Sequence, residues 1–236
     1  MSLLKSEKTR YLARVLWYLR LRRKYREQTM VPKLAYAENL ALVARALDNP
    51  ALDGGAIVEC GTWRGGMSAG LVEVGGPKRQ YYFFDSFEGM PPVEEMDGPE
   101  ALVWQTNPAR RRWGTCDASQ AEFEATIRMT GCPPDIIHVT KGFFENSFPG
   151  FTPPPIAVLR LDADWYASTM ICMEKFWDSV MPGGLILIDD YYAWDGCSRA
   201  IHEGLAKRQA TERVMQTPLG RVAFLVKQQN GAASAK

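Results

Sequence analysis

Apolar residues follow two alternating patterns along the chain, short continuous runs and stretches with helical spacing. The continuous runs have the length and the β-branched or aromatic content of buried strands, and they fall at residues 56–60, 80–85, 136–140, 157–162 and 185–189. Helical spacing occurs before, between and after them, at residues 36–47, 67–74, 120–130, 166–180 and 198–208. This alternation favours an α/β fold, with a parallel sheet, right-handed crossovers and helices on both faces.

The two ends of the chain depart from this alternation. Residues 212–217 and 221–227 flank Pro218-Leu219-Gly220 and predict a terminal β-hairpin. Small and polar residues follow at 229–236, where we expect a disordered tail. At the other end, residues 1–50 predict an N-terminal helical segment that precedes the sheet.

The N-terminal segment combines an apolar stripe with many positive charges. Leu12, Val15, Leu16 and Leu19 recur at helical spacing among seven basic residues between positions 10 and 26. This pattern is compatible with a helix that lies on an anionic membrane and with one that packs its stripe on the core or on a second subunit. Such stripes are the ordinary mark of a packed helix, so we favour packing and expect a homodimer.

A long irregular stretch interrupts the alternation at residues 88–118. It contains Pro91-Pro92, Trp104, three consecutive arginines at 110–112 and Trp113. Connections of this length inside a compact domain usually serve as lids or binding loops. We therefore predict a lid-like insertion at this place.

Composition excludes several classes of protein. The 236 residues are 46% hydrophobic and carry a net charge of +1, so one α/β domain is expected and no overall field attracts nucleic acid. The five cysteines form no CxxC pair, which argues against a disulfide framework and a zinc site and favours a reducing, cytoplasmic compartment. No apolar run reaches the roughly 18 residues of a membrane span, so we expect no stable membrane insertion.

Two pairs of acids follow two of the predicted strands. Asp162 and Asp164 come at the end of one strand, and Asp189 and Asp190 come at the end of the next. Because the carboxyl ends of parallel strands border one crevice, the four carboxylates should gather there. Carboxylates held together repel one another unless a cation neutralises them, and all-oxygen ligands favour magnesium, manganese or calcium over zinc. Each acid alone can also be a helix cap or a turn residue, but both pairs together favour a metal site.

The first predicted strand runs into a turn with three glycines, Glu59-Cys60-Gly61-Thr62-Trp63-Arg64-Gly65-Gly66. Glycines there let the backbone turn tightly and approach a ligand before the next helix begins. Trp63 occupies the place of the middle glycine of dinucleotide-binding loops, so a nicotinamide cofactor fits poorly. Asp85, at the end of the second strand, is placed either to accept both hydroxyls of a ribose or to form the turn into Ser86.

Five stretches of the chain, taken in order, resemble the macrocin O-methyltransferase family. They are residues 58–66 (VECGTWRGG), 84–91 (FDSFEGMP), 141–144 (KGFF), 159–166 (LRLDADWY) and 182–191 (PGGLILIDDY). Members of that family are metal-dependent enzymes that use S-adenosylmethionine to methylate sugar hydroxyls on macrolides and related glycosylated natural products. The resemblance implies a Rossmann-like class I methyltransferase fold over residues 51–228, with a mostly parallel seven-stranded sheet and a C-terminal antiparallel hairpin.

The resemblance also implies roles for individual residues. Asp162, Asp189 and Asp190 are implied to hold Mg²⁺, and Asp164 is implied to be the general base. The residues implied to bind S-adenosylmethionine are Glu59, Gly61, Thr62, Arg64, Gly65, Ser68, Asp85, Ser86, Gly142, Phe143 and Asp162. In an extended segment Asp162 and Asp164 face the same side, so one can ligate while the other accepts a proton. The layout is similar to catechol O-methyltransferase, but Trp165 stands where that enzyme has a catalytic lysine.

These features lead to one expected function and two alternatives. The first is magnesium-dependent transfer of a methyl group from S-adenosylmethionine to a sugar hydroxyl of a glycosylated natural product or glycan, as in antibiotic biosynthesis. The shared metal layout leaves open an O-methyltransferase for catechols or other vicinal diols. The third hypothesis is a non-catalytic, membrane-associated protein with a vestigial cofactor site, and the intact acid pairs argue against it.

Overall fold

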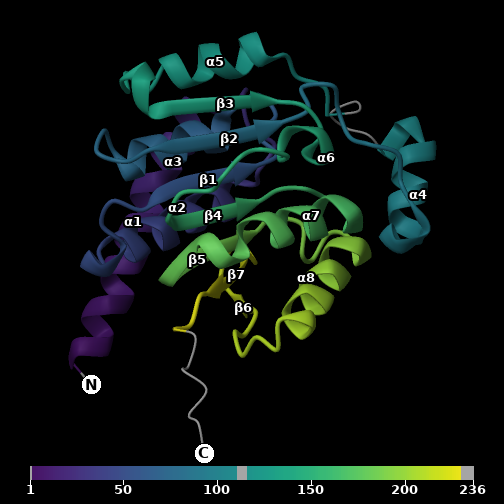
Figure 1. Ribbon diagram of the computed structural model, residues 1–236. Helices are drawn as coiled ribbons and strands as arrows, with labels where there is room; N and C mark the ends of the chain where they lie inside the picture. The colour runs from purple at the N-terminus through teal and green to yellow at the C-terminus, as the bar shows by residue number, and fades with distance from the viewer. Residues whose placement is uncertain (1, 111–115, 230–236) are drawn as a thin grey trace, which may run out of the picture.

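One mixed sheet forms the centre of the molecule (Figure 1). In the computed structural model, which describes residues 2–110 and 116–229, the strand order is β3-β2-β1-β4-β5-β7-β6, with β7 antiparallel to both neighbours and the other pairings parallel. The strands are β1 (Ala56–Cys60), β2 (Tyr81–Asp85), β3 (Ile137–Lys141), β4 (Ile156–Leu161), β5 (Val180–Ile188), β6 (Met215–Gln216) and β7 (Ala223–Val226). The predicted seven-stranded sheet with its C-terminal antiparallel hairpin is confirmed. The predicted tail lies outside the described residues from position 230 onward.

Helices cover both faces of this sheet, as the alternating pattern predicted. The α-helices are α1 (Ser2–Lys24), α2 (Lys33–Leu47), α3 (Gly66–Gly75), α4 (Pro99–Thr106), α5 (Gln120–Arg128), α6 (Phe144–Ser147), α7 (Tyr166–Phe176) and α8 (Asp195–Lys207). Short 3₁₀ turns occur at Pro50–Leu52, Glu95–Asp97, Pro108–Arg110, Pro134–Ile136 and Trp177–Ser179. Figure 1 shows α7 and α8 in front of the sheet, with α2 and α3 behind it.

Alternate residues of each strand pack against the two helical layers. In β1, Ile57 belongs to the apolar core that includes residues of α2, α3 and α5, whereas Val58 belongs to the core that includes residues of α7 and α8. In β5, Leu187 belongs to the first of these cores and Ile188 to the second. Successive side chains of a strand point to opposite faces, so a sheet covered on both faces requires strands that are apolar throughout.

The last three predicted strands differ from the structure at their ends. β5 begins at Val180 instead of at Leu185, because Val180 pairs with Ile156 of β4. The N–H of Gly183 also donates to the carbonyl of Lys227 (2.7 Å), which extends the pairing beyond the end of β7. The two strands of the hairpin are shorter than predicted, with two and four residues.

The stretch predicted as a lid-like insertion at 88–118 contains a helix. α4 begins with Pro99, whose missing N–H would have no partner at this position in any case. Asp97, just before it, is buried and accepts a hydrogen bond from the N–H of Tyr166 (2.6 Å), which fixes the stretch to the start of α7. Residues 111–115 of this stretch, with two of its three consecutive arginines, lie outside the described residues.

The N-terminal helices share the core of the sheet. Leu40 and Val43 of α2 belong to the same apolar cluster as Ile57 of β1 and Leu185 of β5. The helical segment predicted at residues 1–50 therefore packs into the core of the sheet through α2.

The predicted apolar stripe of α1 is divided between two environments. Val15 is buried against Ala37 and Ala41 of α2. Leu12 and Leu16 are exposed, so of the two predicted partners the core of this chain does not cover them. Packing of these two residues on a second subunit stays a prediction. We find no described helix with the length and apolar content that a bilayer span requires.

A buried carboxylate joins both N-terminal helices to the C-terminal hairpin. Glu38 of α2 has no exposed surface. It accepts hydrogen bonds from the hydroxyl of Tyr11 in α1 (2.9 Å) and from the N–H groups of Leu219 (3.2 Å) and Gly220 in the turn before β7. Glu38 thereby connects three segments that lie far apart in the sequence.

We expect Glu38→Ala to lower the free energy of unfolding by about 2–4 kcal/mol, because it removes the acceptor of one hydroxyl and two backbone N–H groups whose hydrogen bonds are partly buried. Urea denaturation followed by circular dichroism measures this. Glu27→Ala is the matched control, since the Glu27 side chain is 72% exposed and pairs with Arg26 at the surface. Equal midpoints for the two variants would contradict a stabilising role of Glu38.

Candidate active site

The site is built where the carboxyl ends of β1, β2, β4 and β5 meet. The chain leaves β1 toward β2 on one side, while β4 pairs with β1 on the other, so the strand order reverses between β1 and β4. Open α/β sheets bind ligands at such a switch point. Backbone hydrogen bonds continue past the strands, from the N–H of Asp162 to Cys60 and from the N–H of Asp189 to Leu161 (2.9 Å each). The main chain therefore fixes both acids at this edge of the sheet.

The glycines after β1 make room for neighbouring parts of the protein. A Cβ atom on Gly61, whose φ is +84°, would lie 1.8 Å from the carbonyl oxygen of Asp162. A Cβ on Gly65 would meet the ring of Phe123 in α5 at 2.7 Å. The sequence predicted that these glycines let the backbone approach a ligand, and the structure gives these two positions close protein neighbours as well.

A cavity of about 230 Å³ lies at these strand ends. The predicted cofactor-binding residues that line it are Gly61, Thr62, Asp85, Ser86, Phe143 and Asp162. The other predicted cofactor-binding residues do not line the cavity; they are Glu59, Arg64, Gly65, Ser68 and Gly142. All four acids of the two predicted pairs line it as well. The structure thus brings six of the eleven predicted cofactor residues and the acids to one cavity.

One wall of the cavity comes from a segment that sequence reasoning missed, Gln28 to Pro32 between α1 and α2. The carbonyl of Gln28 accepts the N–H of Gly66 at the start of α3 (2.8 Å), and the carbonyl of Val31 accepts from Nε of Arg22 in α1 (2.9 Å). The segment is too short to show a periodic pattern, so the sequence offered no signal for it.

Three of the acids come together at one end of the cavity. Asp162, Asp164 and Asp190 each offer a carboxylate oxygen, and these oxygens lie within 4.8 Å of one another. The expectation that an extended segment aligns Asp162 with Asp164 is wrong. Asp164 has a φ of +56° and lies at the centre of a tight turn in which the N–H of Trp165 donates to the carbonyl of Ala163 (2.6 Å). That turn brings the carboxylate of Asp164 to the cluster.

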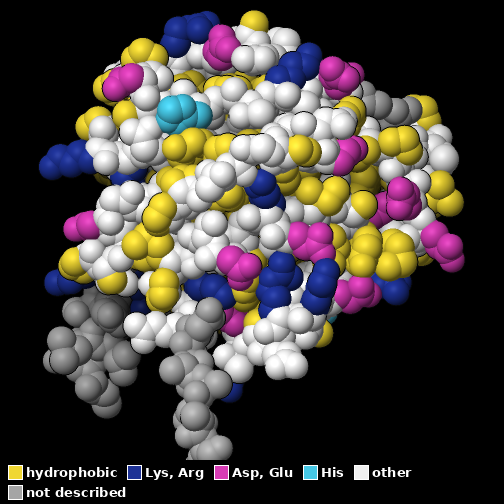
Figure 2. Space-filling view, in the orientation of Figure 1, with side chains coloured by type: hydrophobic (Ala, Val, Ile, Leu, Met, Phe, Trp, Pro, Cys, Tyr) yellow, Lys and Arg dark blue, Asp and Glu magenta, His cyan; other side chains and the backbone are white. Residues whose placement is uncertain are grey.

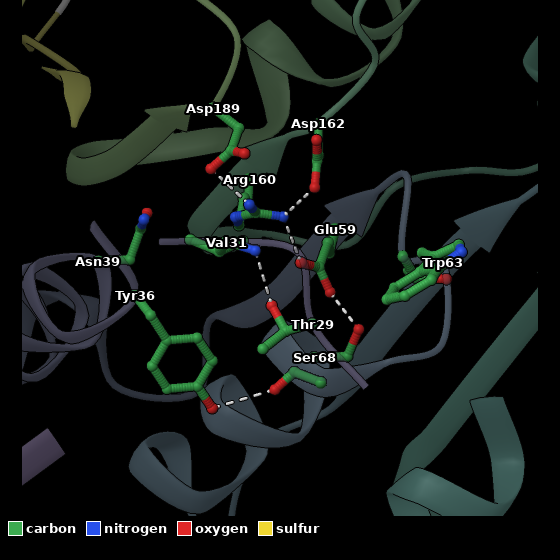
Figure 3. A network of polar contacts seen from close by, with 12 residues as sticks. Thr29, Val31, Tyr36, Asn39, Glu59, Trp63, Ser68, Arg160, Asp162 and Asp189 are labelled. Carbon is green, nitrogen blue, oxygen red and sulfur yellow. Dashed lines mark hydrogen bonds and ion pairs between the residues drawn. The ribbon is translucent and has the colours of Figure 1, made fainter. Parts of the chain in front are cut away.

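The fourth acid, Asp189, lies against a buried arginine that the sequence analysis did not single out. Arg160 of β4 has no exposed surface, and its guanidinium contacts the carboxylates of Glu59 (2.7 Å), Asp162 (2.7 Å) and Asp189 (2.5 Å) (Figure 3). Ser68 of α3 donates to the other oxygen of Glu59. A charged residue between two leucines of a buried strand requires partners, and that was the available signal.

Burial raises the pKa values of four acids at this site, Glu59, Asp164, Asp189 and Asp190. It raises the pKa of Asp164 to about 7, with neighbouring carboxylates adding to the shift. It raises the pKa of Glu59 to about 7 and that of Asp189 to about 6, while Arg160 acts in the opposite direction on both. The pKa of Asp190 lies well above its ordinary value, through burial and the charge of Asp164. One guanidinium thus compensates only part of the negative charge, and a further cation would stabilise the ionised acids.

Asp85 organises the turn after β1. Its Oδ2 accepts the N–H groups of Thr62 (2.7 Å) and Trp63 (2.8 Å) and the hydroxyl of Thr62 (3.3 Å), and its Oδ1 accepts the N–H of Phe87 (2.7 Å). Both readings of Asp85 from the sequence remain compatible with this arrangement. It forms the turn, and Oδ1 retains capacity for a further donor because a carboxylate accepts about four hydrogen bonds.

Three tryptophans from separate segments pack together beside the acids. The indole N–H of Trp194, before α8, donates to Oδ1 of Asp164 (2.9 Å). Its ring packs at an angle against Trp165 (5.2 Å between centroids) and against Trp104 of α4 (6.2 Å). Trp165 is buried and donates to the carbonyl of Pro91 (3.0 Å), so its role here is packing. The cluster connects the α4 stretch to Asp164.

The donor set of the cluster fits a hard divalent cation. Carboxylate oxygens are the ligands that Mg²⁺ and Mn²⁺ prefer, and three of them converge here in a partly buried place. Among the described residues no cysteine or histidine takes part in this group. The adjoining cavity can hold an organic molecule next to the acid cluster.

Comparison with known proteins gives a family and several relatives. A family model described as macrocin-O-methyltransferase (TylF) matches residues 26–224. The 8-demethyl-8-(2,3-dimethoxy-alpha-L-rhamnosyl)-tetracenomycin-C 4'-O-methyltransferase of Streptomyces olivaceus is 34% identical over 153 residues, which are 63% of this chain and 57% of that protein. The mycinamicin III 3''-O-methyltransferase of Micromonospora griseorubida is 28% identical over 169 residues, 69% of this chain and 65% of that protein. The chain thus matches less than two thirds of the length of each relative.

Two solved structures share the fold. The O-methyltransferase NovP superposes with a TM-score of 0.68 at 24% identity, covering 83% of this chain and 82% of that one. CalS11, described as a calicheamicin methyltransferase, superposes with a TM-score of 0.62 at 19% identity, covering 93% and 92%. These likenesses confirm the predicted class I methyltransferase fold.

We expect Arg160→Met to lower the free energy of unfolding by about 3–5 kcal/mol, because removal of one partner leaves uncompensated charge in the interior. Chemical denaturation at neutral pH measures this. Arg199→Met is the matched control, since Arg199 pairs with Glu203 on the surface and its side chain is 53% exposed. Adding Glu59→Gln to Arg160→Met should recover part of the loss; no recovery would argue that the pair does not act as a unit.

Proposed function

The chain belongs to the macrocin-O-methyltransferase family, and on that premise we propose that it transfers a methyl group from S-adenosylmethionine to a sugar hydroxyl of a glycosylated natural product or glycan. The observation that carries the proposal is the cluster of Asp162, Asp164 and Asp190 beside a cavity at the switch point of the sheet. The names of the relatives support the acceptor class, because both are O-methyltransferases and one name includes a rhamnosyl group. A cytoplasmic location and a homodimer stay predictions.

We assign the cofactor to the part of the cavity between the turn after β1 and the end of β2. S-adenosylmethionine supplies an electrophilic methyl group on a sulfonium sulfur. Asp85 would accept a ribose hydroxyl through Oδ1, which has one partner in the turn. Gly61, Thr62, Ser86 and Phe143 would complete the wall around it. The predicted residues outside the lining would act indirectly, as Glu59 and Ser68 do by holding Arg160 and α3.

We assign a magnesium ion to Asp162, Asp189 and Asp190. Asp162 and Asp190 belong to the oxygen cluster, and Asp189 lines the same cavity. Oδ1 of Asp189 contacts Arg160, so its second oxygen can serve as a ligand. The ion would lower the pKa of the acceptor hydroxyl, which is otherwise far too high for ionisation at neutral pH.

We assign to Asp164 the role of general base. Its Oδ1 is held by the indole of Trp194, which leaves Oδ2 to accept the proton from the acceptor hydroxyl. The tight turn at Asp164 and the backbone N–H that it donates to Oδ2 of Asp190 (3.2 Å) keep the base beside the proposed ligands. The surrounding tryptophans limit the access of water from the side of α4.

Incubation with labelled S-adenosylmethionine and panels of deoxysugar glycosides and catechols tests the proposal. We expect methylation of glycosides that EDTA abolishes and Mg²⁺ restores, and no methylation by Asp162→Ala, because both the ion and its proposed ligand are required. Glu27→Ala serves as a surface control with normal activity. Methylation that resists EDTA would exclude the metal assignment, and methylation of catechols alone would replace the acceptor class.

Asp164→Asn separates the base from the ligands. The variant keeps the size of the side chain and tolerates a positive φ, and we expect turnover to fall by about 10²- to 10⁴-fold while metal binding persists. Asp189→Asn should weaken metal binding more than Asp164→Asn does, as titration calorimetry with Mn²⁺ can measure. The opposite order would make Asp164 a ligand and leave the base unassigned.

A further inference from the structure

Helix α1 has a second apolar face, which points away from the protein. Its inner face packs through Val15 against Ala37 and Ala41 of α2. On the outer side, Leu12, Leu16 and Trp17 are 40%, 67% and 59% exposed. Figure 1 shows the N-terminal part of α1 extending past the edge of the sheet and its helical layers. A helix that only packed on the core would need one apolar face.

The exposed face of α1 also carries positive charges without an ion pair to any carboxylate that the structure describes. Arg10, Arg20 and Arg23 are exposed, and none of them forms an ion pair with a described carboxylate. At about 100° per residue they fall in the same half of the helix as the three exposed apolar residues. The guanidinium of Arg20 lies over the ring of Trp17, 5.1 Å from its centroid. The face therefore alternates cationic and apolar side chains.

Charge is distributed unevenly between α1 and the rest of the chain. Residues 9–26 carry seven of the 28 basic side chains and none of the 27 acidic ones, which leaves the remainder with 21 basic and 27 acidic side chains. Some basic residues elsewhere on the surface have an acidic partner, as Lys207 has with Glu174 and Arg199 with Glu203. Figure 2 shows the two signs intermixed over the face formed by α7 and α8.

The positive charge on the exposed face of α1 favours one of the two partners that could cover it, an anionic lipid surface or a second copy of the chain. A second copy that used the same face would bring two groups of unpaired arginines together, and like charges oppose association. An anionic lipid surface accepts both kinds of side chain, because leucine and tryptophan enter the boundary between headgroups and acyl chains while arginine reaches the phosphates. Basic residues beside such a surface are attracted to its negative potential.

We propose that α1 lies flat on an anionic lipid surface, with Leu12, Leu16 and Trp17 inserted at the headgroup boundary and Arg10, Arg20 and Arg23 against lipid phosphates. The attachment is peripheral and leaves the core contacts of Val15 in place. Membrane attachment through α1 does not depend on methyl transfer, so it can be tested separately from the proposed activity.

Flotation of the full chain with vesicles tests the proposal. We expect binding to vesicles of phosphatidylcholine and phosphatidylglycerol in equal parts, weak binding to phosphatidylcholine alone, and loss of binding as salt is raised. Arg20→Gln with Arg23→Gln should weaken binding by ~25-fold, from about fivefold per arginine near the surface. Leu16→Ser with Trp17→Ser should abolish flotation at the same lipid concentration, and circular dichroism checks that both variants remain folded.

Arg128→Gln with Met129→Ser is the matched control, because it removes one exposed arginine and one exposed apolar residue at the end of α5. This variant should float like the wild type. Equal binding to neutral and anionic vesicles, or α1 variants that float like the control, would overturn the proposal. A third outcome would also overturn it: the wild type does not bind vesicles but forms a dimer, and the α1 variants are monomeric. A second copy of the chain would then cover the exposed face of α1.

Discussion

The buried guanidinium of Arg160 is the interaction on which the rest of the site depends. It contacts carboxylates from the ends of three neighbouring strands, Glu59 of β1, Asp162 after β4 and Asp189 after β5. Without this cation the acids at the switch point would repel one another within a partly buried space. With it, the negative charge is reduced but still exceeds what one guanidinium neutralises. The same residue therefore allows the acids to assemble and leaves the site attractive to a divalent cation.

Most of the fold could be predicted from the sequence because the strands are buried on both faces. Runs such as 56–60 and 185–189 are apolar except for one acid each, Glu59 and Asp189, and a near-continuous apolar run distinguishes a covered parallel sheet from a half-exposed one. The errors lie where backbone pairing decides the outcome. Gly183 joins β5 through a hydrogen bond to Lys227, and no residue property of a Pro-Gly-Gly stretch indicates a strand. Likewise, the spacing of Leu16 in α1 indicates a helix but does not say which side meets α2.

The candidate site was predictable in part. The position of acids directly after apolar strands placed Asp162, Asp189 and Asp190 at one edge, since topology alone brings those ends together. The sequence could not show that Asp164 arrives there through a turn with positive φ, or that its partner is Trp194, 30 residues later. Contacts of this kind depend on how loops fold back over the sheet. Arg160 is the one missed residue with a readable signal, a charge inside a buried strand.

The segment from Gln28 to Pro32 closes one side of the cavity although it precedes the first strand and takes no part in the sheet. Its carbonyl at Gln28 caps an N–H at the start of α3, so a shortened protein that began at α2 would expose both the cavity and that helix end. Conversely, the shape of this wall can diverge among relatives, or be redesigned, by exchanging a few loop residues while strands, acids and Arg160 stay the same. Selectivity toward bulky ligands can thus evolve separately from the reactive centre.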